Sequence, residues 1–110
     1  MSLTSEFEMD GSDFNGVRFT YSDGVVKASF SGLLWDIEET KQRFKAFLEK
    51  AKKGEFANIE FEGCNGESSV CHKKGFVSFT VSKYGGNGCG DLSVTLPLDL
   101  CIPALENVAS

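Results

Sequence analysis

The chain has 110 residues, of which 41% are hydrophobic and 25% charged, with a formal net charge of -5. This composition is typical of one globular domain with a single core and excludes a disordered chain. The acidic balance disfavours phosphate backbones and anionic lipid surfaces, so neither nucleic acid nor a membrane is expected as a partner. No apolar run reaches the ~18 residues that a membrane helix needs.

The N-terminal stretch "MSLTSEFEMD" has neither a basic segment nor an apolar one, so it does not read as a signal peptide, and a cytoplasmic location is expected. We expect a single domain over residues 1–110, with residues 1–6 either disordered or not native to the protein. In that compartment, Cys64, Cys71, Cys89 and Cys101 are expected to be reduced rather than paired. Their loose spacing does not indicate a zinc site.

The first predicted element is a hairpin, "GVRFTYSDGVVKASF", preceded by a short strand around Phe7 to Met9. Asp23-Gly24 suits a two-residue type I′ turn, in which glycine accepts the positive φ. That turn would place Tyr21 opposite Val26, and the alternation would put the apolar side chains of both strands on one face.

A helix is predicted over residues 36–54, in "DIEETKQRFKAFLEKAKKG". Asp36 is its expected N-cap and Gly54 follows its last turn. Its apolar residues recur at helical spacing and form one core-facing stripe. They are Ile37, Phe44, Phe47, Leu48 and Ala51.

Two further strands are predicted in "FANIEFEG" and "GFVSFTVSKY", and a third pairs back through a Gly86-Asn87 turn. That turn puts Val81 opposite Leu92, while Pro97 suits the end of the last strand. A short helix is allowed from Pro103. The predicted fold is therefore α+β: an antiparallel sheet of about five strands in the order (β)ββαβββ, with one amphipathic helix on one face and a short terminal helix.

One constellation near the middle of the chain offers possible chemistry. If the strands of residues 59–63 and 76–81 pair directly, parity sets Cys64 opposite His72 and Glu62 opposite Lys74. Sulfur, imidazole and carboxylate could then form a partial metal site, or His72 could activate Cys64 or Cys71. No orienting third group is identifiable, so the sequence predicts an exposed loop histidine, with no catalytic, metal or cofactor site.

The segment "HKKGFVSFTV" resembles part of an RNA-recognition motif, which carries a basic, glycine-aromatic octamer on a central strand. That octamer needs two exposed aromatics two residues apart. Here only Phe76 has that parity, and Ser78 takes the second position. The glycines of "GGNGCG" are likewise assigned to a turn and not to a phosphate loop, because no Lys-Ser/Thr follows them.

The sheet face turned away from the helix is the best candidate for function. Its residues should be Asn58, Glu60, Glu62, Phe76, Ser78, Thr80, Ser82, Tyr84, Ser93 and Thr95. Such a face can simply be solvated. Otherwise it forms a flat polar platform with aromatic anchors, suited to a protein partner or to self-association. The candidate interaction residues are Glu60, Glu62, Phe76, Ser78, Thr80, Tyr84 and Trp35, of which Trp35 lies at the strand–helix junction.

The layout resembles small bacterial single-domain proteins of the toxin-immunity type and accessory proteins carried on mobile gene cassettes. The similarity rests on Trp35-Asp36 with Glu38 or Glu39 at the helix start and on "F-x-x-I-x-F-E" in the next strand, within residues 17–82. It implies a non-catalytic acidic protein that blocks a partner, such as a basic toxin.

The leading hypothesis is a non-enzymatic protein-binding module without a cofactor. Two alternatives remain open. The first is a small-ligand carrier or enzyme with a cavity walled by Phe44, Phe47 and Phe79 between helix and sheet. The second is a structural homodimer.

Overall fold

The computed structural model describes residues 2–32, 36–63, 66–83 and 90–110, which form strands and helices in the order βββαββββα. The elements are β1 (Ser2–Asp10), β2 (Asp13–Ser22), β3 (Lys27–Gly32), α1 (Ile37–Lys52), β4 (Ala57–Gly63), β5 (Gly66–Lys73), β6 (Phe76–Lys83), β7 (Gly90–Pro97) and α2 (Leu98–Ala109). The order of elements predicted from the sequence lacked strand β5, because the segment between β4 and β6 was interpreted as a loop.

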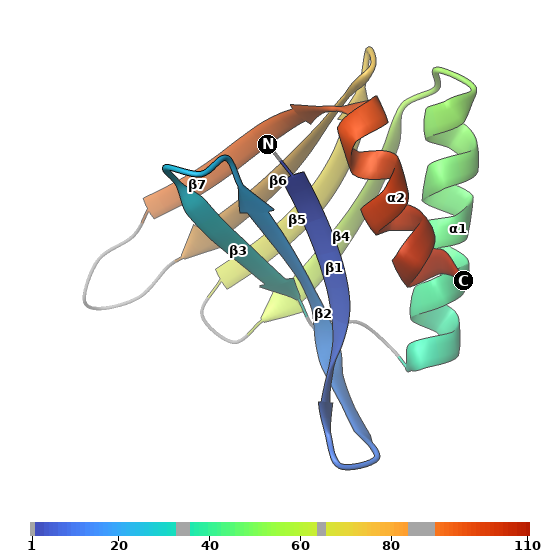
Figure 1. Cartoon of the computed structure of the whole chain (residues 1–110). Helices are drawn as coiled ribbons and strands as arrows, with labels where there is room; N and C mark the ends of the chain where they lie inside the picture. Colours follow the sequence, from blue (N-terminus) through green and yellow to red (C-terminus); the bar gives the residue numbers. More distant parts are fainter. Residues whose placement is uncertain (1, 33–35, 64–65, 84–89) are drawn as a thin grey trace.

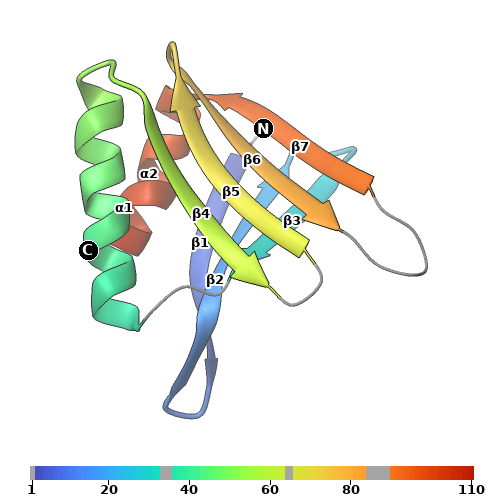
Figure 2. The same ribbon diagram turned by 180° about the vertical axis from the view of Figure 1, so that it is seen from behind.

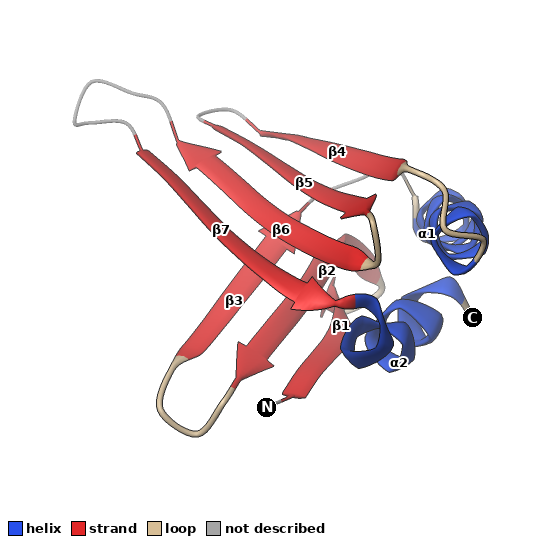
Figure 3. Ribbon diagram, turned by 90° about the horizontal axis from the view of Figure 1, so that it is seen from above, coloured by secondary structure: helices blue, strands red, loops and turns tan. Residues whose placement is uncertain are grey.

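The strands form two antiparallel sheets, β1-β2-β3 and β4-β5-β6-β7. An α+β fold with antiparallel strands is thus confirmed, but the prediction of one sheet of about five strands is wrong. The two sheets face each other, and α1 and α2 lie side by side along one side of the pair (Figures 1 and 3). Seven strands with one apolar face each can bury those faces against one another. The prediction had one sheet covered by a helix. In the structure, each sheet is instead covered by the other sheet.

Strand β1 pairs with β2 along its whole length, from Ser2 opposite Ser22 to Asp10 opposite Asp13. Residues 2–6, which were expected to lie outside the ordered fold, belong to this strand, and Leu3 is buried in the core. The predicted strand at residues 7–9 was thus too short. Ser5, a polar residue between Leu3 and Phe7 on the inward side, interrupted the apolar alternation in the sequence.

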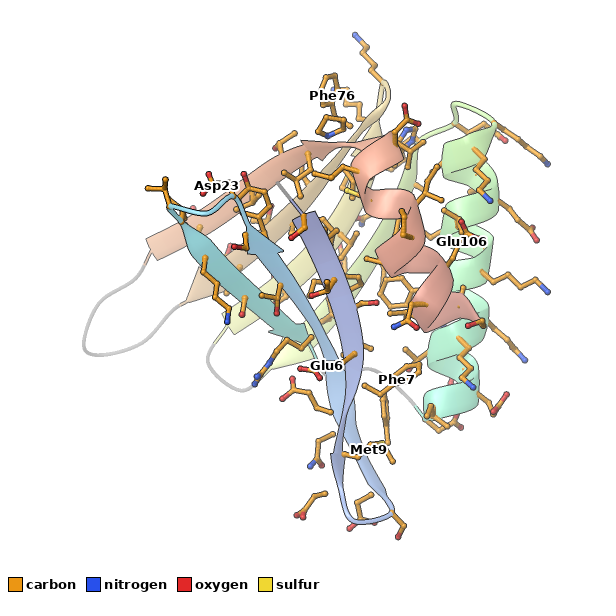
Figure 4. The ribbon with its side chains drawn as sticks, in the orientation of Figure 1. Glu6, Phe7, Met9, Asp23, Phe76 and Glu106 are labelled. Carbon is orange, nitrogen blue, oxygen red and sulfur yellow. The ribbon has the colours of Figure 1, made fainter. Side chains whose placement is uncertain are left out.

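The β2–β3 hairpin has the predicted facing but a different register. Tyr21 lies opposite Ala28 and not Val26, because the connection spans four residues instead of two. The Asp23 carboxylate accepts the backbone N–H groups of Val25 and Val26 at 2.9 and 2.6 Å, which closes the wider loop (Figure 4). The bonds from Val26 and Val25 hold the pKa of Asp23 below its ordinary value, so the loop loses this support as pH falls through that lowered pKa.

Strand β5 lies between β4 and β6, so the expected direct pairing of β4 with β6 is wrong. A two-residue turn joins β5 to β6, with φ of 52° at Lys74 and 85° at Gly75. Positive φ at both central residues is the type I′ arrangement, which sequences usually signal with Asn-Gly or Asp-Gly. Lysine at the first position concealed the turn.

The β6–β7 pairing has the predicted register, with Val77, Phe79 and Val81 opposite Leu96, Val94 and Leu92. Pro97 ends β7 as expected. The proposed Gly86-Asn87 turn lies outside the described residues. The alternation of apolar and polar residues on both strands agrees with this register.

Helix α1 begins as predicted, with the Asp36 carboxylate accepting the Glu39 N–H at 2.7 Å. Helix α2 begins at Leu98, five residues before the expected Pro103, which lies inside the helix. Its first N–H, that of Leu98, donates to the Gly75 carbonyl at 2.9 Å. The chain can therefore pass directly from β7 into a helix, and burial of Cys101, Leu105 and Val108 compensates for the bond that proline lacks.

The core lies between the two sheets and reaches the helix pair. Phe19 on β2 is its centre, with ring centroids 5.6 Å from Phe44 on α1 and 5.0 Å from Phe79 on β6. Phe44 also contacts Phe61 on β4 at 6.2 Å. Such aromatic pairs contribute roughly 0.5–1.5 kcal/mol each beyond their area burial. These four rings join both sheets to α1, so the layers are held by one continuous cluster.

Candidate functional site

The sheet β4–β7 has one face in the core and one face that no other element covers (Figure 2). We call the uncovered side the outer face. Its described members are Asn58, Glu60, Glu67, Ser69, Cys71, Lys73, Phe76, Ser78, Thr80, Ser82, Asp91, Ser93 and Thr95. Strand alternation produces this division, because the inward neighbours Ile59, Val70, Val77 and Phe79 are all buried.

Short hydroxyl side chains occupy the middle of the outer face. Ser78 and Thr95 hydrogen-bond through their hydroxyls at 2.9 Å, and Thr80 and Ser93 do the same at 3.0 Å. Both pairs span β6 and β7, where directly opposed side chains are close enough for such contacts. The result is a shallow, level surface with polar groups that can exchange their mutual bonds for bonds to another molecule.

The two ends of the outer face differ in chemistry. At one end, Glu62, Glu67, Ser82 and Asp91 succeed one another across the four strands, with Glu60 in the adjoining row. Neither ion pair found among the described residues, Arg18–Glu8 or Arg43–Glu39, involves the outer face. Glu60 accepts a hydrogen bond from the Asn58 side chain at 3.4 Å, and Glu67 and Asp91 are exposed, so this end of the outer face carries negative charge that basic groups can approach.

At the other end, Phe76 lies beside the β5–β6 turn with 51% of its surface exposed (Figure 4). Lys73, opposite it on β5, is also exposed. Aromatic side chains are enriched among the contact residues of protein interfaces, so Phe76 is a candidate anchor for a partner.

The structure brings four predicted interaction residues together on the outer face: Glu60, Phe76, Ser78 and Thr80. Glu62 was expected to lie opposite Lys74, but the strand register places the backbone of Glu62 opposite Glu67. The predictions for Tyr84 and Trp35 fall outside the described residues. Sequence reasoning missed Glu67, Ser69 and Cys71, all on β5. Their alternation with Ser68, Val70 and His72 was the signal that could have indicated strand β5.

His72 is not an exposed loop residue, as was predicted, but is fully buried on the inner face of β5. Its Nδ1 lies 2.7 Å from the Glu55 carbonyl, and its Nε2 accepts the Gly75 N–H at 3.2 Å. A carbonyl only accepts and an amide N–H only donates, so these contacts require the neutral ring with its proton on Nδ1. His72 thus ties the β5–β6 turn to the segment before β4.

The positions of His72 and Cys71 do not support the partial metal site or the activated cysteine that the sequence suggested. His72 and Cys71 are neighbours on one strand and therefore point to opposite faces of the sheet. Cys64 lies outside the described residues. Among the described residues no three His, Cys, Asp or Glu side chains are arranged to hold a metal ion.

The two described cysteines differ in environment, and both are free thiols. Cys101 on α2 is fully buried, and this burial raises the pKa of its thiol to about 12. Cys71 is partly exposed in the middle of the outer face, between Asn58 and Ser78. Below pH ~8.5, where an unfolded thiol is still protonated, we expect iodoacetamide to modify Cys71 much faster than Cys101. Peptide mass spectrometry measures both rates, and equal rates in the folded protein would contradict the assigned burial.

The raised pKa of the Cys101 thiol predicts that the protein loses stability at alkaline pH. Because the folded pKa of Cys101 exceeds the unfolded value of about 8.5, the stabilisation by its buried neutral thiol is complete below that pH. It is lost as pH rises toward 12. The free energy of unfolding should therefore fall over this range, and fall less steeply in Cys101→Ala, as urea titrations at successive pH values would show.

These features define a class: a small α+β protein of two facing antiparallel sheets, with one sheet face left open, polar and partly acidic. The chain belongs to a family of unknown function (DUF5766), which matches residues 27–107 and hence more than half of the chain. The outer face lies wholly within the matched region, whereas β1 and β2 precede it. Neither curated proteins nor solved structures gave a match. Neither helix of the described chain is long and apolar enough to cross a membrane.

Proposed function

We propose that the chain is a non-enzymatic protein-binding module and that the outer face of β4–β7 is its binding surface. The observation that carries this proposal is an uncovered sheet face with a half-exposed aromatic at one end and a row of carboxylates at the other. A partner would cover the hydroxyl rows, seat an apolar group against Phe76 and place basic side chains against Glu60, Glu67 and Asp91.

The charge distribution supports a basic partner. Carboxylates in one row of a flat surface raise the local concentration of a positively charged protein and orient it before contact. Phe76 would supply the short-range anchor, because truncating an aromatic anchor residue of a protein interface typically weakens binding by ~2 kcal/mol or more. Association should accordingly slow with added salt, while the lifetime of the complex should depend on Phe76.

The resemblance to toxin-immunity and cassette-borne accessory proteins gives a more specific version of this proposal, in which the basic partner is a toxin. Co-expression with the product of a neighbouring gene tests that version. Rescue of growth by the wild-type chain, and its loss in an outer-face variant, would support the immunity role. Equal growth with and without the chain would contradict it.

No observation on the described residues supports the alternative of a ligand cavity between helix and sheet. Of the three phenylalanines expected to wall it, Phe44 and Phe79 both pack on Phe19 and Phe47 is buried.

The proposal is tested by capture from the organism that encodes the chain, using two variants with the same chemical change. Thr80→Arg places a long cationic side chain in the middle of the outer face. Thr4→Arg makes the same change on β1, where Thr4 is exposed on the other sheet. We expect Thr80→Arg to lose at least ~30-fold of partner recovery, the equivalent of ~2 kcal/mol, and Thr4→Arg to retain it. Equal recovery by both variants would exclude the outer face as the binding surface.

A further inference from the structure

The four sheet edges of this protein are not equally protected. Beside β1 lies α2, whose Asn107 side chain donates to the Ser5 carbonyl at 2.9 Å, while the Ser5 hydroxyl donates to the Ala104 carbonyl at 2.6 Å. Edge strand β4 runs beside α1 (Figure 2). Strand β3 is six residues long and begins with an exposed lysine, two common safeguards against unwanted pairing. Strand β7 has eight residues, and no element lies beyond it in any view (Figures 1 to 3).

The hydrogen-bond pattern shows which backbone groups β7 leaves open. Leu98 donates its N–H to Gly75 on the β6 side, so Leu96, Val94 and Leu92 also turn their backbone groups toward β6. The alternate residues, Asp91, Ser93 and Thr95, turn N–H and C=O away from the sheet. No group in the described ranges hydrogen-bonds to these outward amides and carbonyls. They form a ready template for another strand.

The side chains of β7 do little to prevent such pairing. Its sequence, "GDLSVTLP", contains no lysine or arginine and one acid, Asp91. Leu92 points toward the inner side but is 58% exposed, because the opposite sheet does not extend over it. Val94 is only partly buried. A further strand at this edge would remove both apolar side chains from water.

We infer that β7 pairs antiparallel with β7 of a second copy of this chain, across a two-fold axis at Val94. In this register Ser93 lies opposite Thr95 of the second copy, and the two exchange both backbone bonds. Their hydroxyls then lie on the outer face, beside those of the Thr80–Ser93 and Ser78–Thr95 pairs. Leu92 meets Leu96 of the second copy on the inner side.

The ends of β7 fit the same arrangement. Pro97 has no N–H but keeps its carbonyl, which receives the N–H of Asp91 from the second copy. The two Asp91 side chains fall at opposite ends of the pairing and do not repel each other. A strand complementary to itself in its backbone hydrogen bonds favours a second copy over a foreign strand. Two four-stranded sheets become one continuous sheet, whose outer faces join into a single surface.

The inference does not depend on the proposed function, because it concerns the edge of the sheet and not its outer face. An interface of one strand pair is small, so a dissociation constant on the order of micromolar is expected. Sedimentation equilibrium in reducing buffer, over a range of protein concentrations, should show twice the 12.0 kDa mass of the chain at the upper end. Reducing conditions keep the exposed Cys71 from linking two molecules.

A matched pair of variants tests the location. Leu92→Lys places a charge on the exposed edge, and Val26→Lys makes a comparable change in the β2–β3 loop, where Val26 is 54% exposed. Leu92→Lys should weaken dimerisation by at least tenfold and Val26→Lys should leave it unchanged, with circular dichroism confirming that both fold. A protein monomeric throughout the concentration range, or a dimer that Leu92→Lys does not weaken, would overturn the inference.

Amide hydrogen exchange identifies the strand directly. The amides of Ser93 and Thr95 should become protected as concentration rises, whereas that of Val94, bonded within the sheet, should be protected at every concentration. A dimer in which Ser93 and Thr95 still exchange freely would also overturn the inference. Thr80→Arg should still dimerise, and Leu92→Lys should still bind the partner of the outer face, so each proposal can fail without the other.

Discussion

Replacing His72 with phenylalanine is expected to lower the free energy of unfolding by about 1–3 kcal/mol. The substitution keeps a ring of similar size in the core but removes both polar contacts of the imidazole. The Glu55 carbonyl and the Gly75 N–H then lose their partner, and because both residues are exposed, each lost hydrogen bond costs about 0.5–1.5 kcal/mol. Urea unfolding followed by circular dichroism measures the change.

The control for His72→Phe is Lys73→Ala, one residue along β5. Lys73 is exposed, and its truncation should change stability by less than about 0.5 kcal/mol. Nitrogen NMR of the imidazole adds an independent check, because the contacts of His72 require the neutral form protonated at Nδ1. A stability loss no larger than that of the control, or a ring protonated at Nε2 alone, would contradict the assigned burial and bonding.

Replacing Phe44 with alanine should have the second large effect, a loss of about 3–5 kcal/mol. The Phe44 ring is fully buried and touches Phe19 in one sheet and Phe61 in the other. Removing it separates α1 from both layers at once and leaves a cavity that three elements would have to close. Since whole domains are stable by only 5–15 kcal/mol, this variant is expected to unfold at a markedly lower temperature.

Phe56→Ala provides the matched control for Phe44→Ala, because it deletes the same ring from a side chain that is 63% exposed. Its effect should be under about 0.5 kcal/mol. If Phe44→Ala abolishes folding altogether, Phe44→Leu retains part of the volume and should give a smaller, measurable loss. Similar losses for Phe44→Ala and Phe56→Ala would show that the aromatic cluster does not join the layers.

Local signals in the sequence predicted those elements in which turn chemistry and alternation agree. The β6–β7 register and the Asp36 cap of α1 follow from residues adjacent in the chain, and both were predicted. The β2–β3 turn failed because Asp23 binds two backbone amides across a wider loop, which competes with the shorter turn that Asp-Gly also allows. The two turns present the same faces, so Val17 and Phe19 lie in the core as predicted, whereas Val26, predicted to share their face, lies in the loop and is 54% exposed.

The missing strand had a different cause. Strand β5 buries Val70 and a histidine, with Ser68 as the next inward residue, so its inner face lacks the continuous apolar pattern of its neighbours. Its turn begins with Lys74, a residue seldom found at positive φ. The burial of His72 depends on Glu55 and Gly75, which come from segments on either side of β4 and β5. No local pattern in the sequence encodes such a contact.

The outer face was nonetheless predicted in large part, because parity alone assigns alternate residues to it. Adding β5 between β4 and β6 left Glu60, Ser78 and Thr80 on the same side, since a whole inserted strand does not change the facing of its neighbours. The second sheet could not be foreseen in this way. Which layer covers the inner face is decided by long-range packing of Phe19 on Phe79 and not by either strand alone.

The central claim is that the outer face of β4–β7 binds a protein partner, and Cys71 offers a direct probe of it. This thiol lies in the middle of the outer face, whereas Cys101 is buried in the core. We would measure the rate of Cys71 alkylation in Cys101→Ala protein, alone and with the protein captured from the native host. The account predicts that bound partner slows the modification of Cys71 at least tenfold and that Thr80→Arg abolishes this protection. Alkylation at the same rate in the free and the partner-bound chain would contradict it.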